Sequence, residues 1–169
     1  SANEAWLLAV VGPLLDAVEL MHGANCYHRD IAPDNILILE GGAPVLLDLG
    51  AARKVLSDTV QALTVMLKPG YTPIEQYAEE PAMKQGPWTD VYALGATLYW
   101  VVAGRKPPDA EARAAGATMP SALELGREHF DARFLAAIDW ALQMDPAARP
   151  GSVQAWRTHL LGDLSTPRA

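Results

Sequence analysis

The sequence predicts a mostly helical α+β domain that contains one small β-hairpin. Three observations lead to this fold class: an amphipathic segment at the start of the chain, an almost entirely apolar segment near its middle, and two short apolar runs on either side of a Gly-Gly turn. A length of 169 residues corresponds to one domain. A domain of that size buries roughly 70% of its unfolded surface, so its core needs no disulfide bonds or structural metal ions for stability.

The first helix is predicted within residues 4–22, where apolar side chains recur every three or four positions. Pro13 lacks a backbone N–H and is expected to kink this helix or restart it, and Gly23 is expected to end it. The apolar runs 36–39 and 44–48 flank the turn EGGA and predict the hairpin.

Residues 89–103 are apolar nearly all round, and a helix of that kind is buried on every side. They predict a helix through the centre of the domain. Residues 49–72 contain no long periodic segment and are expected to form a long surface segment. A connector with one short helix is expected at 104–122, and the ranges 131–144 and 152–161 predict two further amphipathic helices.

The composition narrows the classes of partner and compartment. A net charge of −7 argues against nucleic acid or an anionic membrane as the main partner. Cys26 is the one cysteine, which excludes an internal disulfide framework and fits a reducing, cytoplasmic location. No stretch is expected to reach the roughly 18 apolar residues of a membrane span, and no signal peptide is recognised. Because the first residue is Ser1, we expect a piece of a longer protein.

Two groups of polar residues flank the predicted hairpin. Asp30 and Asn35 come just before its first strand, and Asp48 follows its second strand. An Asp followed five residues later by an Asn, just before an apolar run, looks like a site for a metal ion and a hydroxyl group. A site of this kind raises the question of phosphoryl transfer.

His28-Arg29-Asp30 with Asn35, and the later Asp48-Leu49-Gly50, resemble the catalytic loop and metal-binding triplet of protein kinases. Three later stretches resemble the same family in the same order: PGYTPIEQY the end of the activation segment, TDVYALG the start of the central helix, and DPAARP the turn with a late structural arginine. The chain is thus similar to the C-terminal lobe of a bacterial, eukaryotic-like (Hanks-type) serine/threonine protein kinase. The resemblance covers 1–162, and 163–169 is expected to be a flexible tail.

The resemblance implies chemical roles for several residues. Asp30 would accept or orient the proton of the attacking hydroxyl, and Arg29 would receive a phosphate on the activation segment. Asn35 and Asp48 would hold Mg²⁺, and Leu37 would lie under the adenine of ATP. The candidate phosphosites are Ser57, Thr59 and Thr64. Each of these three is equally well interpreted as an ordinary solvated loop hydroxyl.

The residues expected to be structural are His28, Leu49, Gly50, Glu75, Asp90 and Arg149. His28 would pack against Leu49 and hold the metal-binding triplet. Asp90 would brace the backbone of the catalytic loop. Glu75 and Arg149 would form a buried two-point ion pair that ties the activation segment to the lower part of the domain.

The phosphate-handling parts of the family's N-terminal lobe do not occur in these residues: the Gly-rich loop, the strand lysine and the helix glutamate. They would precede Ser1. Positioning supplies most of the catalysis in phosphoryl transfer, so this chain alone is expected to be inactive. It is also expected to expose the apolar floor of the nucleotide cleft, a patch that favours self-association.

Three functions remain open at this point. The first is the C-terminal lobe of an active kinase that acts on Ser/Thr of a protein substrate, and Pro33 favours Ser/Thr over Tyr. The second is a pseudokinase scaffold, which only Ala32 supports. The third is a small-molecule kinase of the aminoglycoside-phosphotransferase kind, against which Arg29 and Glu75 argue.

Ala32 occupies the position where serine/threonine kinases carry a lysine, two residues after the catalytic Asp. Aligned on Glu75, Lys68 takes the position of the activation-segment threonine that lies beside that lysine. We therefore hypothesise that the cation has moved across the site, with the Lys68 ammonium near Asp30. Two unit charges about 4 Å apart interact by up to roughly 4 kcal/mol at an effective dielectric near 20. The alternative is a solvated loop lysine.

Overall fold

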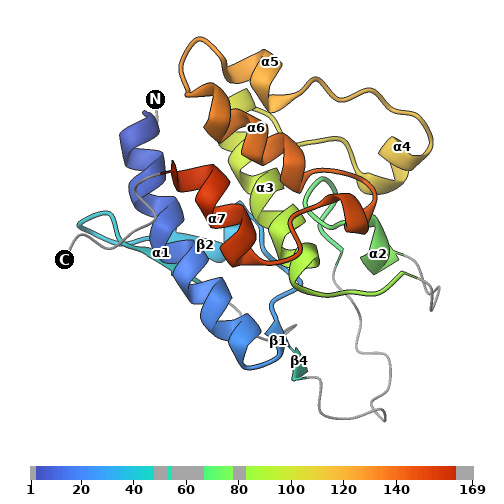
Figure 1. Cartoon of the computed structure of the whole chain (residues 1–169), viewed down its shortest axis with the longest axis horizontal. Coiled ribbons are helices and arrows are strands. Elements are labelled where there is room, and N and C mark those ends of the chain that lie inside the picture. Colours follow the sequence, from blue (N-terminus) through green and yellow to red (C-terminus); the bar gives the residue numbers. More distant parts are fainter. Residues whose placement is uncertain (1–2, 48–52, 55–66, 78–82, 163–169) are drawn as a thin grey trace.

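The computed structural model describes residues 3–47, 53–54, 67–77 and 83–162. The fold is mostly helical, as predicted, with one core and two short antiparallel sheets that contact the first helix (Figure 1). The predicted triplet Asp48, Leu49 and Gly50 lies outside the described residues. So do the candidate phosphosites Ser57, Thr59 and Thr64 and the predicted tail at 163–169.

Helix α1 (Glu4–Gly23) is the first predicted helix. The side chain of Asn3 begins it by accepting the Trp6 N–H at 2.8 Å. The helix runs without interruption through Pro13, so the predicted restart is wrong. Its buried face continues on both sides of the proline, and this packing holds the helix together despite the missing hydrogen-bond donor.

Helix α1 also corrects the expectation that no segment could reach the length of a membrane span. It has 20 residues and a mean hydropathy of 1.4, which satisfies the length and composition of a span. However, its apolar side chains from Leu7 to Val18 line the core of the domain. On its outer side Arg157 pairs with Asp16 at 2.5 Å and with Glu19 at 3.2 Å. These contacts are those of a core helix in a globular domain.

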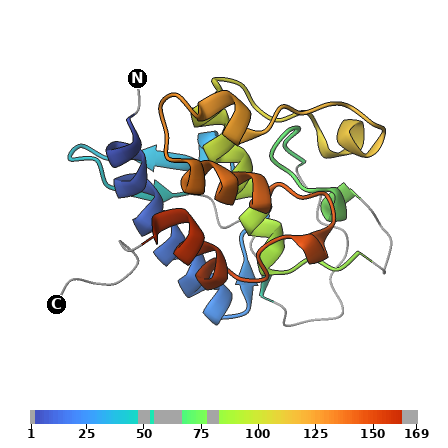
Figure 2. The same ribbon diagram turned by 45° about the horizontal axis from the view of Figure 1, so that its top comes forward.

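Helix α3 (Pro87–Ala103) is the predicted central helix. Every residue from Thr89 to Tyr99 is buried. It contacts α5, α6 and α7, and it lies in the middle of the molecule in both views (Figures 1 and 2). Asp90, in its first turn, is therefore anchored in the most buried element of the fold.

Helices α6 (Ala132–Ala141) and α7 (Val153–Leu161) are the last two predicted helices. Each begins at a side chain that accepts a backbone N–H of the first turn, Asp131 for α6 and Ser152 for α7. The 3-10 turn η3 (Pro146–Ala148) joins them. Helix α7 packs along α1, and the two lie side by side in both views (Figure 2).

Three further helices among the described residues are short. Helix α2 (Ile74–Tyr77) belongs to the PIEQY stretch, and α4 (Ala110–Ala114) is the short helix expected in the connector. Helix α5 (Ala122–Gly126) was not predicted. It has five residues, which is too short for an apolar repeat to be recognised.

The predicted hairpin is present. Strands β2 (Ile36–Ile38) and β3 (Pro44–Leu46) pair antiparallel, with Leu37 opposite Val45. Gly41 and Gly42 in the turn have φ values of +99° and +90°, which glycine adopts without strain. The short 3-10 turn η1 (Pro33–Asn35) leads into β2.

The two faces of the hairpin have different surroundings. Ile36 and Leu46 pack against the core. On the other face Leu37, Leu39 and Leu47 are 48%, 44% and 39% exposed. We call these three residues the hairpin face. The exposed apolar surface is where the sequence predicted the floor of a nucleotide cleft.

A second small sheet was not predicted. Strand β1 (Cys26–Tyr27) pairs antiparallel with β4 (Arg53–Lys54), within the range 49–72 that was expected to be a surface segment. Each strand has two residues, too few for an alternating pattern, so its pairing depends on the tertiary fold.

Candidate active site

The loop between β1 and β2 is fixed to the central helix by Asp90. The buried Asp90 carboxylate accepts the backbone N–H of His28 and that of Arg29, each at 2.9 Å. Arg29 has a φ of +64°, in the left-handed region that non-glycine residues seldom adopt. The carboxylate therefore holds the loop in a conformation that the chain would otherwise avoid, in the position expected of a brace.

His22 is a third partner of Asp90, and the sequence analysis missed it. Its Nε2 lies 2.7 Å from Asp90 Oδ2, and its ring packs edge-on against that of Tyr27. His22 is in the last turn of α1, so Asp90 joins α1, α3 and the loop at one point. A polar side chain in the last turn of a largely apolar helix was the available signal.

His28 is fully buried and uses both ring nitrogens. Nδ1 accepts the backbone N–H of Asp30 at 3.1 Å, so the ring proton is on Nε2, which donates to the Leu47 carbonyl at 2.9 Å. His28 thus connects the loop to the end of the hairpin, from which the Asp48 triplet continues. Its expected packing partner, Leu49, lies outside the described residues.

Asp30 and Asn35 are brought together as the spacing suggested. Asn35 Nδ2 donates to the Asp30 carbonyl at 2.7 Å and to Asp30 Oδ2 at 3.0 Å. The other carboxylate oxygen, Oδ1, is buried and accepts no hydrogen bond from the residues that the structure describes. One oxygen of Asp30 is therefore held by a hydrogen bond within the described part of the chain, and the other is not.

Lys68, from the described segment 67–77, contacts the same carboxylate. Its Nζ lies 3.4 Å from Asp30 Oδ1, within the reach that the sequence hypothesis requires. It also donates a hydrogen bond of 2.8 Å to Asp34 Oδ1. The sequence analysis assigned no role to Asp34, although its carboxylate directly precedes Asn35 in the loop.

Tyr71 lies close to this group of charges. Burial raises the pKa of its hydroxyl above the usual value, and the nearby Asp34 carboxylate acts in the same direction. Tyr71 therefore stays neutral at physiological pH, and it adds no negative charge beside Lys68.

Glu75 and Arg149 form the predicted two-point contact. Their nitrogen–oxygen distances are 2.7 and 3.1 Å, and both side chains are buried. The remaining N–H groups of Arg149 donate to backbone carbonyl oxygens, those of Trp88, Gln143 and Met144. All five donors of the guanidinium are thus satisfied, which is what allows this charge to be buried.

Gln76 links the same segment to the loop between β1 and β2. Its side-chain N–H donates to the Arg29 carbonyl at 3.0 Å. Two neighbouring residues of α2 therefore contact different parts of the domain. Glu75 binds Arg149, and Gln76 binds the loop between β1 and β2. The PIEQY stretch resembled the kinase family in sequence, but no role was predicted for Gln76.

The predicted magnesium ligands are only partly within the described residues. Asn35 is buried beside Asp30, and with its amide N–H directed at Asp30 it retains an amide oxygen, the kind of donor that Mg²⁺ prefers. Asp48 lies outside the described part of the chain. Within the part that the structure describes, no group of three or more His, Cys, Asp or Glu side chains could hold a metal ion. Leu37, predicted under the adenine, is on the hairpin face.

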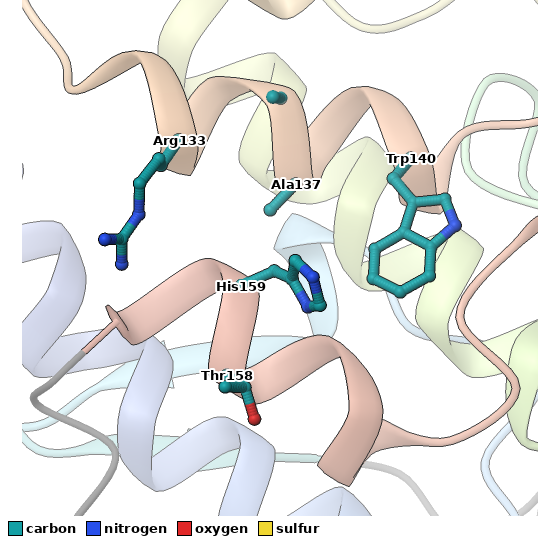
Figure 3. A pocket seen from close by; sticks show the side chains of 6 residues that line it. Arg133, Ala137, Trp140, Thr158 and His159 are labelled. Carbon is teal, nitrogen blue, oxygen red and sulfur yellow. The ribbon is translucent and has the colours of Figure 1, made fainter.

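A separate pocket of about 420 Å³ lies between α6 and α7 (Figure 3). Arg133 and Trp140 line it from α6, and Thr158 and His159 line it from α7. The rings of Trp140 and His159 meet edge to face at 4.8 Å. The pocket contains none of the predicted site residues.

Comparison with known proteins identifies the family. The model of the protein kinase domain matches residues 2–161. The chain belongs to the protein kinase family. A solved structure described as "PpkA-294 apo form" matches this kinase domain with a TM-score of 0.79 and 39% identity, over 94% of this chain and 54% of that one.

Curated relatives of this kinase chain are named as serine/threonine-protein kinases. Serine/threonine-protein kinase C of Synechocystis sp. is 30% identical over 90% of this chain and 29% of its own length. PknL of Mycobacterium tuberculosis is 32% identical over 79% of this chain and 31% of its own length. PknA of Nostoc sp. is 35% identical over 58% and 18%. The kinase chain thus spans less than a third of each of these relatives.

Proposed function

We propose that this chain is the C-terminal, catalytic lobe of a serine/threonine protein kinase, which transfers the γ-phosphate of ATP to a protein substrate. The arrangement of Asp30 carries the proposal. Asn35 holds one carboxylate oxygen, the other is buried and accepts no hydrogen bond from the described residues although the Lys68 ammonium lies 3.4 Å away, and Asp90 fixes the loop. The names of the relatives and Pro33 in the loop support Ser/Thr as the acceptor.

In the proposed reaction the oxygen of the substrate hydroxyl forms a bond to the γ-phosphorus. The bond from that phosphorus to the bridging oxygen breaks, and its electron pair leaves with ADP. The hydroxyl proton moves to Asp30. Oδ1 is the suitable acceptor, because the Asn35 amide already occupies Oδ2.

Protein kinases generally use Mg²⁺, which would offset the negative charge of the phosphate groups when bound. Asn35 and Asp48 would hold it here. The hydrogen bonds from Asn35 to Asp30 keep the amide oriented, so that its oxygen can serve as a ligand.

The function is tested with the full-length protein, labelled ATP, Mg²⁺, a mixture of protein substrates and a panel of aminosugars. Labelled serine and threonine in protein would support the proposal. Label in the sugars alone would identify a small-molecule kinase. No label in either, with nucleotide still bound or not, would favour the scaffold function.

The isolated 169-residue chain is expected to bind ATP and Mg²⁺ at least about ten-fold more weakly than the full-length protein. Magnesium sites usually need substrate phosphates as ligands, and the phosphates would be contacted here from one side only. Titration calorimetry on both proteins measures the difference. Equal affinities would show that this chain holds the nucleotide by itself.

The isolated chain is also expected to associate with a second copy through the hairpin face, since Leu37, Leu39 and Leu47 form an exposed apolar patch. Sedimentation velocity should show concentration-dependent dimers, and a Leu37→Ser, Leu47→Ser double variant should stay monomeric. Leu20→Ser is the matched control, because Leu20 is 79% exposed on α1 and lies outside the patch. Monomers at every concentration, or an equal effect of the control, would contradict the expectation.

A further inference from the structure

Lys68 supplies a cation where the catalytic loop has none. From Ile31 to Asn35 the loop contains no Lys or Arg, and Ala32 is buried with 1% exposure. Two carboxylates, Asp30 and Asp34, nevertheless border the place where a highly charged phosphate group would arrive. Without a cation from another segment, their charges would repel the transferred group.

We propose that Lys68 contacts the transferred phosphoryl group as a catalytic residue, and that Asp34 is the positioning residue that holds its ammonium in place. The inference rests on the proposed function. It goes further in two ways. It assigns the missing cation to Lys68, which precedes Pro69-Gly70-Tyr71, and it gives a role to Asp34, a loop carboxylate close to the proton acceptor Asp30.

The backbone of Lys68 is fixed. Its N–H donates to the Thr72 hydroxyl at 2.7 Å, and its carbonyl accepts the N–H groups of Tyr71 and Thr72, each at 3.0 Å. The turn packs closely against the connector, because a Cβ at Gly70 would come 2.8 Å from the Pro107 carbonyl oxygen. Gly70 also has a φ of +90°. These contacts hold the backbone of Lys68, so its side chain is the part with the greater freedom to follow a ligand.

The distances explain why two carboxylates are useful. A strong charge-assisted hydrogen bond from an ammonium is about 2.7–2.9 Å long. The contact of Lys68 with Asp34 has this length, 2.8 Å, whereas its contact with Asp30 is 3.4 Å. Asp34 thus takes the hydrogen bond of the ammonium and leaves Asp30 Oδ1 able to accept the substrate proton.

The two carboxylates also differ in burial, and this difference supports the same division of roles. The side chain of Asp30 is 9% exposed and that of Lys68 is 19% exposed, but that of Asp34 is 71% exposed. Water can replace the ammonium at Asp34 at little cost. The ammonium can therefore move from Asp34 toward the phosphoryl oxygens as negative charge gathers on them, while Asp30 remains in place.

The test uses Lys68→Ala in the full-length protein, with Lys84→Ala as the matched control because Lys84 is an exposed lysine outside this cluster. We expect Lys68→Ala to lower kcat by about ten-fold or more. The affinity for a non-hydrolysable ATP analogue, relative to that for ADP, should fall by about the same factor, because only the former carries the group that Lys68 contacts. Lys84→Ala should leave both quantities unchanged.

Asp34 is tested by a double-mutant cycle. Asp34→Asn should lower kcat by about three-fold in the parent protein and have no further effect in the Lys68→Ala background, since it acts through Lys68. An equal loss in both backgrounds would mean that Asp34 only supports the structure, and it would overturn the positioning role. The pair Ala32→Lys with Lys68→Thr, which returns a cation to the loop, should restore part of the turnover lost in Lys68→Thr.

The outcomes separate this inference from the proposed function. A parent protein that phosphorylates nothing contradicts the proposed function, and the ratio of ATP-analogue to ADP affinity still tests Lys68. An unchanged ratio and an unchanged kcat in Lys68→Ala would overturn the assignment of the cation. A parent protein that binds neither nucleotide would overturn both.

Discussion

An Arg149→Ala variant is expected to lose about 3–5 kcal/mol of unfolding free energy, because it leaves the buried Glu75 carboxylate without its partner. The same substitution removes the donors to three backbone carbonyl oxygens, one at the start of α3 and two just after α6. The guanidinium also stacks on the ring of Tyr92, with 4.7 Å from Cζ to the ring centroid. Its loss therefore affects charge, hydrogen bonding and packing together.

Urea denaturation of the chain, followed by circular dichroism, measures this loss. Arg157→Ala is the matched control, since Arg157 pairs with the more exposed Asp16 and Glu19 on the surface and should cost less than about 1 kcal/mol. A Glu75→Leu, Arg149→Met double variant should be less destabilised than the sum of the two single changes. An equal loss of unfolding free energy in Arg149→Ala and Arg157→Ala would show that the buried ion pair stabilises the domain no more than the surface pair does.

The second large effect concerns catalysis. Asp30→Asn in the full-length protein is expected to reduce kcat by about 10²–10⁴-fold, the usual contribution of a positioned proton acceptor. An amide has nearly the shape of the carboxylate and can still accept the hydrogen bond from Asn35, but it cannot take up the hydroxyl proton. Nucleotide affinity should change little, because the proposed role of Asp30 is toward the acceptor hydroxyl.

Steady-state rates with a protein substrate, together with nucleotide titrations, test this expectation. Glu128→Gln is the control for loss of one negative charge, since Glu128 is an exposed carboxylate on another part of the surface. Retention of more than about a tenth of the parent turnover in Asp30→Asn would exclude Asp30 as the proton acceptor.

The sequence predicted the long elements of the fold because each carries its own signal. The all-round apolar character of 89–103 fixed α3, and the apolar repeat of 4–22 fixed α1. The pairing of β1 with β4 has no such local signal, because two-residue strands are stabilised by the contacts that the fold creates. The continuity of α1 through Pro13 has the same cause, since tertiary packing outweighs a local preference.

The residues of the candidate site likewise fall into those with a local signal in the sequence and those without one. Asp30 and Asn35 were found because their spacing forms a recognisable pattern, and the structure brings them together. Asp90 was found through the resemblance of TDVYALG to the kinase family, and it accepts the backbone N–H groups of the same loop. His22 and Gln76 were missed because their partners are 68 and 47 positions away in the sequence, respectively, and nothing in either residue's neighbourhood specifies the partner. Long-range hydrogen bonds of single polar side chains leave no periodic trace in a sequence.

The hydrogen bonds from the loop between β1 and β2 to Asp90 also determine whether this loop becomes ordered during folding or only on binding. Ordering a loop residue costs about 1–2 kcal/mol of conformational entropy, and the left-handed Arg29 adds strain of similar size. Because the buried carboxylate holds both N–H groups from within the core, this cost is met when the domain folds and not when substrate binds. The loop is thus ordered in advance, so under the proposed function binding energy would remain for alignment of the reactants. A substitution of Asp90 would then weaken the fold and slow the proposed transfer through one and the same contact.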